Sequence, residues 1–201
     1  MSDGLYDTLA EQASEIPLEV PAARVFFPVS LFKLTIMSLF SLGLYEIYWF
    51  YRNWQLVKAH ESLRILPFAR AFFTIFFCYQ FFVWVRKAGL SQKNSPPLAA
   101  GALAIGWITF YFIGGLSDPY WVISLLKVFF LLPVQAQVNR INAIQAPTVD
   151  INSHFGAWNR VVIVVGAILF IFTILESFSP DTYMIEGGPL LQADLIRKEA
   201  A

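Results

Sequence analysis

Long apolar stretches alternate with short polar segments along most of this chain. A membrane helix needs about 20 mainly apolar residues to cross a hydrocarbon layer about 30 Å thick, and several stretches approach that length. The sequence therefore predicts an all-α, multi-pass helical membrane protein with four to five transmembrane helices plus interfacial amphipathic helices. The candidate spans cover residues 31–51, 66–85, 97–116, 120–134 and 161–178.

Polar segments flank this helical membrane domain, which is predicted to cover residues 26–178. Residues 1–25 are acidic and contain prolines, so they are predicted to form a soluble tail. Residues 179–201 are predicted to form a second soluble tail, with a short helix in its last part. The chain does not begin with a cationic region followed by a short apolar core, so a cleaved signal peptide is not expected. We therefore expect the first span to remain as a membrane anchor.

The first candidate span has a long apolar run that ends in aromatic residues. Residues 34–51 are nearly all apolar or aromatic and would form roughly 27 Å of helix. Lys33 precedes this run, and its long stem would carry the ammonium back to the interface. Rings with polar tips crowd the other end, which is typical of side chains at the level of the lipid headgroups. The expected interfacial anchors there are Tyr45, Tyr48, Trp49, Tyr51 and Trp54, and Trp158 has the same role before the last span.

The second candidate span is short, because its continuous apolar core covers only residues 71–85. This segment either crosses the bilayer with Arg70 snorkelling at its start or enters and returns on the same side. Crossing is the favoured alternative.

The fourth candidate span is also short and carries Lys127 near its middle. Beyond Pro133, apolar residues recur every three positions, which predicts an amphipathic helix that leaves the membrane. Residues 53–61 have a similar pattern and are predicted to lie along the membrane surface. In the third span, small residues between Ala100 and Gly106 would permit the close approach of a neighbouring helix.

Composition supports the membrane assignment and narrows the partners. Hydrophobic residues make up 57% of the chain and charged residues only 14%, whereas about 25% charged residues is usual in soluble domains. The formal net charge is zero, and no basic cluster is interleaved with aromatics, so a nucleic acid partner is not expected. Cys78 is the only cysteine, which excludes a disulfide or a cysteine metal site within one chain.

Basic residues do not indicate an orientation for five crossings. With the amino terminus inside, equal numbers of lysines and arginines fall on the two sides, so the positive-inside rule gives no bias. This balance suggests that one of the short segments does not cross fully. The inner set is Arg24, Arg86, Lys87, Lys93, Arg140 and Arg160, and the outer set is Arg52, Lys58, Arg64, Arg70, Arg197 and Lys198.

Three ionisable residues form the candidate intramembrane polar site: Glu46, Lys127 and Arg70. Glu46 lies about five residues inside the expected membrane exit, where a carboxylate is costly unless it is neutralised, paired or wetted. It is either a proton or cation site, the counter-charge of Lys127, or a hydrated carboxylate bonded to Arg52 or a tyrosine hydroxyl. The hydrated carboxylate is favoured, because the residue is shallow.

No cofactor, metal or catalytic residue is assigned. His60 and His154 fall in predicted surface stretches and lack the spacing of a metal site, so they are interpreted as ordinary surface histidines. The chain contains no Gly-x-Ser-x-Gly sequence and no glycine-rich phosphate loop. Lys33 and His60 recur as Lys127 and His154 at one offset, which would fit an inverted repeat, although chance is the favoured explanation.

The segment Ser41-Leu-Gly-Leu-Tyr-Glu-Ile-Tyr-Trp-Phe-Tyr51, together with Leu-Pro-Phe-Ala-Arg-Ala-Phe-Phe at residues 66–73, resembles a family of small bacterial membrane proteins. Members share a Gly-[Ile/Leu]-Tyr-x-x-Tyr-Trp signature at the end of their first span and have no assigned function. The resemblance covers about residues 27–178. It implies a bacterial inner (cytoplasmic) membrane location and implies no activity, substrate or catalytic residue.

Three functions follow as hypotheses. The favoured one is a non-enzymatic membrane component that binds a partner protein or lipid. Its expected partners are the lipid bilayer and either another protein or a second copy of the chain. The alternative is a small permease or proton-coupled channel that uses Glu46 and Lys127. A membrane enzyme acting on lipid is third, since acid–base catalysis needs paired groups that the sequence does not provide.

Overall fold

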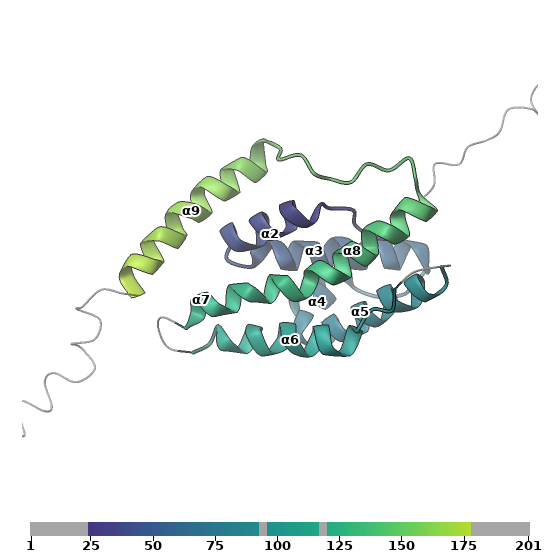
Figure 1. Ribbon diagram of the computed structural model, residues 1–201, viewed down its shortest axis with the longest axis horizontal. Helices are drawn as coiled ribbons and strands as arrows, with labels where there is room; N and C mark the ends of the chain where they lie inside the picture. Colours follow the sequence, from purple (N-terminus) through teal and green to yellow (C-terminus); the bar gives the residue numbers. More distant parts are fainter. Residues whose placement is uncertain (1–23, 93–95, 117–119, 178–201) are drawn as a thin grey trace, which may run out of the picture.

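The computed structural model describes residues 24–92, 96–116 and 120–177, and this part of the chain is all helical (Figure 1). The only β pairing described within it is an isolated bridge between Val29 and Asn152. Both predicted soluble tails lie almost wholly outside the described residues. The helices are α2 (Leu31–Phe40), α3 (Leu44–His60), α4 (Pro67–Phe72), α5 (Thr74–Leu90), α6 (Ala100–Ile113), α7 (Trp121–Ser124), the 3₁₀ helix η1 (Leu125–Lys127), α8 (Val128–Gln145) and α9 (Ala157–Ser177).

The segment predicted as one first span is two helices joined by a tight turn. Leu42 and Gly43 both have positive φ, 52° and 88°, which a continuing α-helix does not allow. The Gly43 amide donates to the Ser38 carbonyl at 2.8 Å, and the Tyr45 amide donates to the Ser41 hydroxyl at 2.8 Å. These bonds satisfy backbone groups that the break would otherwise leave unpaired. The prediction of a continuous helix over residues 31–51 is therefore wrong.

The turn sends α3 back toward the end of the molecule from which α2 begins (Figure 1). One cavity brings Val25 and Phe26, which precede α2, together with Val57 and His60 at the end of α3. The last turns of α5 and α8 reach the same cavity, through Ala88 and Gln145. We call this the charged end, because the adjoining segments carry most of the described basic residues. These are Arg24, Lys58, Arg64, Arg86, Lys87 and Arg140.

The opposite end, called the turn end, gathers the chain reversals. A second cavity there is lined by residues of the α2–α3 turn, of the α4–α5 junction at Phe73, and of η1. Helices α4 and α5 meet at Phe73, so residues 66–85 are two helices and not one continuous helix. Both alternatives for this segment, a single crossing and entry with return on the same side, stay predictions.

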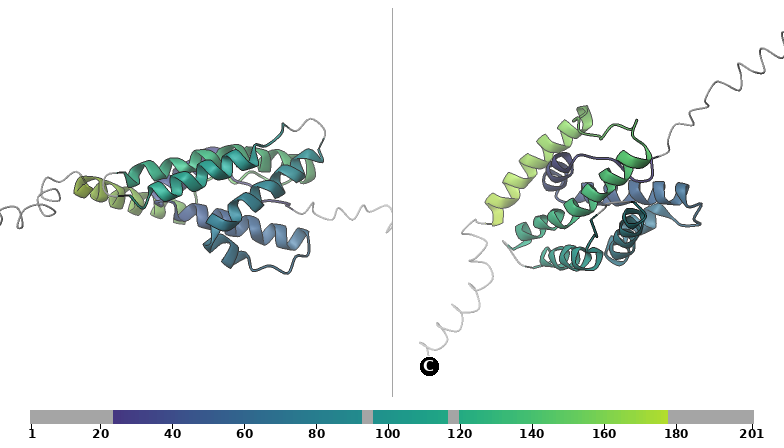
Figure 2. Two further views of the ribbon diagram at one scale, coloured as in Figure 1. Left: turned by 90° about the horizontal axis from the view of Figure 1, so that it is seen from below. Right: turned by 45° about the vertical axis from the view of Figure 1, so that its right-hand side comes forward.

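Two of the described helical segments are long and apolar enough to cross a membrane, judged by length and composition. They are the continuous run of α7, η1 and α8, Trp121–Gln145, and helix α9. They differ in how they pack: 44% of the most apolar part of the first segment is buried inside the protein, but only 11% in α9. Helix α9 thus lies along one side of the bundle (Figures 1 and 2).

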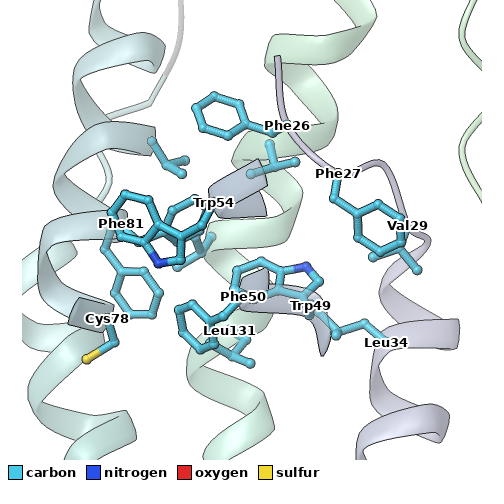
Figure 3. Packing of buried hydrophobic residues seen from close by; sticks show 14 of the residues in the cluster. Phe26, Phe27, Val29, Leu34, Trp49, Phe50, Trp54, Cys78, Phe81 and Leu131 are labelled. Carbon is cyan, nitrogen blue, oxygen red and sulfur yellow. The ribbon is translucent and has the colours of Figure 1, made fainter. Parts of the chain in front are cut away.

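The core between α3, α5 and α8 is mainly aromatic (Figure 3). Trp49 packs edge-to-face on Phe81 with ring centroids 5.3 Å apart, and Trp54 packs on the same ring at 5.6 Å. Such edge contacts suit the quadrupoles of the rings. Trp49 and Trp54 are fully buried and Tyr45 nearly so, which corrects their assignment as interfacial anchors.

The remaining predicted anchors are more accessible. Trp158 at the start of α9 has 82% of its surface exposed, and Tyr48 has 46%. Tyr51 is half-buried, and its hydroxyl accepts from Gln55 at 2.8 Å. These three side chains are accessible at the protein surface, and their role as interfacial anchors stays a prediction.

Buried amides fix the extended segment that precedes α2. Asn142 accepts from the Phe26 amide at 3.2 Å and donates to the Phe26 carbonyl at 2.9 Å. Gln135 accepts from the indole of Trp49 at 2.6 Å and donates to the Val29 carbonyl at 3.2 Å. A non-helical segment in an apolar core must find such partners, so these amides explain how it is tolerated there.

Small residues permit close helix contacts, as predicted for the third span. Ala100 and Ala104 of α6 are buried, and a β-carbon at Gly106 would run into the ring of Phe130 on α8. Nothing lies near the corresponding position of Gly101. Helix α6 therefore packs on both α5 and α8, and its surface at Gly101 is open.

Candidate functional site

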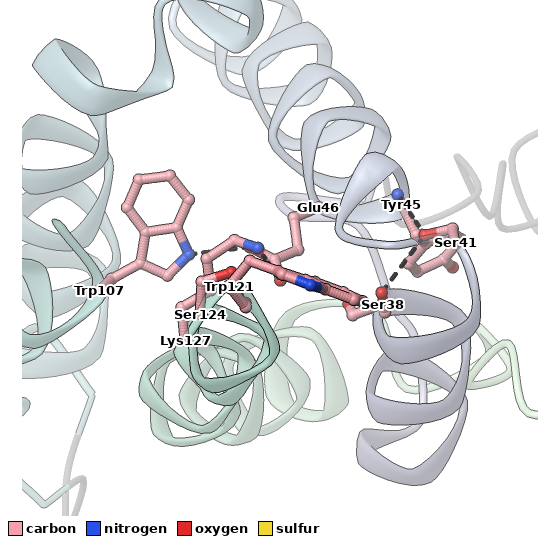
Figure 4. A network of polar contacts seen from close by, with 8 residues as sticks. All are labelled: Ser38, Ser41, Tyr45, Glu46, Trp107, Trp121, Ser124 and Lys127. Carbon is pink, nitrogen blue, oxygen red and sulfur yellow. Dashed lines mark hydrogen bonds and ion pairs between the residues drawn. The ribbon is translucent and has the colours of Figure 1, made fainter. Parts of the chain in front are cut away.

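Glu46 and Lys127 form a buried ion pair at the turn end (Figure 4). Glu46 lies in the first turn of α3 with 2% of its surface exposed, and Lys127 is the last residue of η1. The Lys127 Nζ to Glu46 Oε1 distance is 3.5 Å. The chain reversal at Gly43 places the start of α3 beside η1, so the fold brings together two charges 81 residues apart in sequence.

A third side chain completes this site. The indole Nε1 of Trp107, on α6, donates a 2.9 Å hydrogen bond to Glu46 Oε2 (Figure 4). The carboxylate thus receives a hydrogen bond on one oxygen and a cation near the other, which together offset the cost of removing it from water. Of the alternatives predicted for Glu46, the structure shows the one in which its carboxylate is the counter-charge of Lys127.

Gly43 is required at this site for two reasons. Its φ of 88° disfavours any residue with a side chain. In addition, a β-carbon there would lie 2.7 Å from Lys127 Nζ, closer than van der Waals contact allows. The glycine therefore shapes the turn and leaves room for the ammonium group.

The ion pair borders a cavity of about 420 Å³ at the turn end. Its walls are largely apolar, with Leu42, Phe72 and Tyr111 among the lining residues. Glu46 Oε1 faces this region without a hydrogen bond. The arrangement can hold a charge pair out of water.

Arg70, the third predicted site residue, does not join this pair. Its Nη1 donates to Gln80 Oε1 at 2.8 Å, and its guanidinium carbon lies 4.6 Å from the ring centroid of Trp54. A guanidinium over an indole face is a favourable cation–π contact. Arg70 therefore has a packing role between α4, α3 and α5. Arg52, proposed as a partner of Glu46, instead donates to Gln55 at 3.0 Å.

The histidines lie apart from the polar site. His60 Nδ1 is 3.2 Å from Glu61 at the charged end, whereas the carbonyl of His154 accepts from Lys33. Within the described ranges, no group of three or more His, Cys, Asp or Glu side chains is placed to hold a metal ion.

Sequence reasoning missed two features of the buried polar residues. Lys33 is not snorkelling to the surface, since it is only 3% exposed and its Nζ donates to Asn152 Oδ1 and to the His154 carbonyl. The second feature is the hydrogen bond from Trp107 to Glu46, since the sequence placed Trp107 only in an apolar span. The hydropathy pattern gives no signal for either contact, because each partner comes from a segment distant in sequence.

Comparisons with protein-family models, with curated proteins and with solved structures found no match to this chain. The resemblance to the family with the Gly-[Ile/Leu]-Tyr-x-x-Tyr-Trp signature therefore stays a prediction, and the function rests on the geometry alone.

Proposed function

We propose that this chain is an integral membrane protein without enzymatic activity that acts by binding a lipid or protein partner within the bilayer. The observation that carries this proposal is the surface of α9. Most of its large side chains are exposed and apolar, including Ile168, Leu169 and Phe172, each more than half exposed. Soluble monomers rarely expose contiguous apolar patches of more than a few hundred Å², so lipid or a partner covers this face.

The charge distribution supports a specific arrangement in the membrane. If α2–α3 and α4–α5 are hairpins that enter and leave on the same side, then Arg52, Lys58 and Arg64 join the basic residues of the inner set. The balance of basic residues expected for five crossings then becomes a strong bias. By the positive-inside rule, the charged end faces the cytoplasm and α9 crosses toward the other side.

The state of the buried charges favours binding over catalysis. Glu46 and Lys127 neutralise each other, and Trp107 holds one carboxylate oxygen. Acid–base catalysis requires a group free to exchange a proton with a substrate within hydrogen-bond reach. Because Glu46 is already paired with Lys127 and hydrogen-bonded to Trp107, these side chains are better suited to holding α3, α6 and η1 together.

Two measurements test this proposal. The protein should remain in the membrane fraction after alkaline carbonate extraction, and about one tightly held lipid or protein partner per chain should persist through purification in mild detergent. Release by carbonate would contradict the membrane assignment. A purified chain that retains no partner but shows turnover or ion flux in vesicles would contradict the binding role.

A small permease or proton-coupled channel remains the second candidate, because the ion pair borders a cavity and Glu46 Oε1 has no hydrogen bond. In vesicles reconstituted with purified protein, a permease predicts flux that is abolished in Glu46→Gln. The matched control is Glu61→Gln, which changes an exposed glutamate at the charged end. Flux that is absent from the wild type, or equal in both variants, contradicts this candidate.

A further inference from the structure

A cavity of about 640 Å³ lies between α2, the start of α3 and the start of α9. It is separate from the Glu46–Lys127 site, which borders the cavity at the turn end. Its lining combines a lysine, amides and aromatic rings with aliphatic side chains. The lining residues that matter here are Lys33, Met37, Leu44, Asn152, His154 and Val162.

Lys33 gives this cavity a buried positive charge. Its Nζ donates to Asn152 Oδ1 at 2.7 Å and to the His154 carbonyl at 2.6 Å, and both acceptors are neutral. No carboxylate in the described part of the chain forms an ion pair with it. The two bonds and a cation–π contact with the ring of Phe155, whose centroid is 5.7 Å from Nζ, orient the ammonium, but no anionic group balances its charge. A buried charge in this state is costly unless an anion accompanies it.

The cavity carries its charged residue, Lys33, at one end and has uncharged residues at the other. Lys33, Asn152 and His154 lie where α2 begins, and Ser41 and Leu44 lie at the turn that follows α2. Eight residues of helix separate Lys33 from Ser41, roughly 12 Å along the axis. Met37 and Val162 line the space between them. A positive charge at one end and aliphatic side chains further along match an anionic headgroup followed by an acyl chain.

We propose that this cavity binds one anionic phospholipid, with the phosphate on Lys33 Nζ and an acyl chain between Met37 and Val162. The inference rests on the proposed function, because it requires the chain to lie in a bilayer. Charge complementarity selects an anionic lipid over a zwitterionic one. Lys33 offers a positive charge, and no residue lining the cavity is acidic, so a quaternary ammonium finds no counter-charge there.

Native mass spectrometry of the full chain in mild detergent tests the proposal directly. The purified protein is delipidated and then titrated with phosphatidylglycerol or phosphatidylcholine of identical acyl chains. One phosphatidylglycerol should be retained at collision energies that remove phosphatidylcholine. Glycerol phosphate, which has the headgroup charge without tails, should not be retained. Equal retention of both lipids, or retention of glycerol phosphate alone, would overturn the proposal.

Variants separate the charge from the shape of the site. Lys33→Met should weaken phosphatidylglycerol retention by roughly tenfold or more, as expected for a lost charged hydrogen bond, and Lys33→Arg should preserve it. Lys58→Met is the control, because Lys58 is exposed on α3 away from the cavity. Unchanged retention in Lys33→Met would overturn the headgroup assignment.

A second pair of variants leaves Lys33 in place, so the proposal stays testable if Lys33→Met does not fold. Val162→Trp fills the cavity and should abolish selective retention, whereas Val161→Trp, on the neighbouring residue outside the lining, should not. Equal retention in these two variants would overturn the site. If the wild type stays in carbonate-washed membranes but shows no lipid preference, only this inference fails, and the proposed function stands.

Discussion

Gly166 of α9 lies directly against the backbone of Phe40, the last residue of α2, so closely that a β-carbon on Gly166 would overlap the Phe40 carbonyl oxygen. The contact involves main chain on both sides, so no side-chain rotation can relieve it. It brings the mostly exposed α9 onto the bundle near the turn end. A second link is the hydrogen bond from Trp121 Nε1 to Ser177 Oγ at 3.0 Å.

Gly166→Ala should therefore separate α9 from α2. Overpacking of a tight contact costs about 1–3 kcal/mol, and the thermal midpoint in detergent should fall accordingly. Gly101→Ala is the matched control, because nothing lies near that position and alanine favours a helix by up to about 1 kcal/mol. The two substitutions are expected to shift the midpoint in opposite directions, and a rise for both would show that α9 does not pack on Phe40.

The Glu46–Lys127 pair should behave as a coupled unit. Removing one partner from a buried pair strands the other charge and costs about 3–5 kcal/mol, so Glu46→Gln and Lys127→Met should each lower the thermal midpoint strongly. The double variant should recover much of the loss, which a double-mutant cycle measures as a coupling free energy. Additive losses would mean that the two charges do not interact.

Gln135 should contribute more to the stability of the fold than the solvent-exposed residues of α8. Gln135→Leu removes the acceptor for the Trp49 indole and the donor for the Val29 and Phe27 carbonyls. Each buried polar group left unpaired costs about 1–3 kcal/mol. Gln145→Leu, at an exposed position, serves as the control. Comparable thermal stability of the two variants would contradict the described contacts of the segment before α2.

The hairpin arrangement makes a labelling prediction. With Cys78 replaced by serine, single cysteines at Glu61, Ser91 and Ser153 should all react with an impermeant maleimide from the cytoplasmic side. A cysteine at Leu116, near the turn end, should not react from that side. Five full crossings would instead place Glu61 and Ser91 on opposite sides, so the pattern decides between the two arrangements.

Hydropathy was sufficient to predict an all-helical chain and the position of α9, because both depend only on the length and composition of apolar runs. It did not predict the reversal at Gly43. A glycine within an apolar run is compatible with a continuous helix, and the left-handed turn is stabilised by local bonds from Ser38 and Ser41. The break at Phe73 has no glycine or proline, so tertiary packing determines it.

The predicted aromatic anchors show a second limit of prediction from sequence. Headgroup-level rings and core rings have the same residue types, and one sequence does not reveal which face of a helix meets another. Trp49 is buried because Gln135 and Phe81 lie opposite it, on helices far along the chain. The pairing of Glu46 with Lys127 was among the predicted alternatives, since a carboxylate inside the membrane is costly unless it is paired, although hydration was favoured because the residue is shallow. The contribution of Trp107 depended on the fold.

The reversal at Leu42 and Gly43 has a consequence for biogenesis. A folded-back pair can enter the bilayer from the cytoplasmic face without carrying a charged loop through the hydrocarbon layer, and α4–α5 can do the same. The connection between α6 and α7 and the segment that follows α9 would then be the polar stretches that must be translocated. Chains stalled on the ribosome just before Ala157 should already resist carbonate extraction, with the polar segments of the charged end still accessible to protease added on the ribosome side.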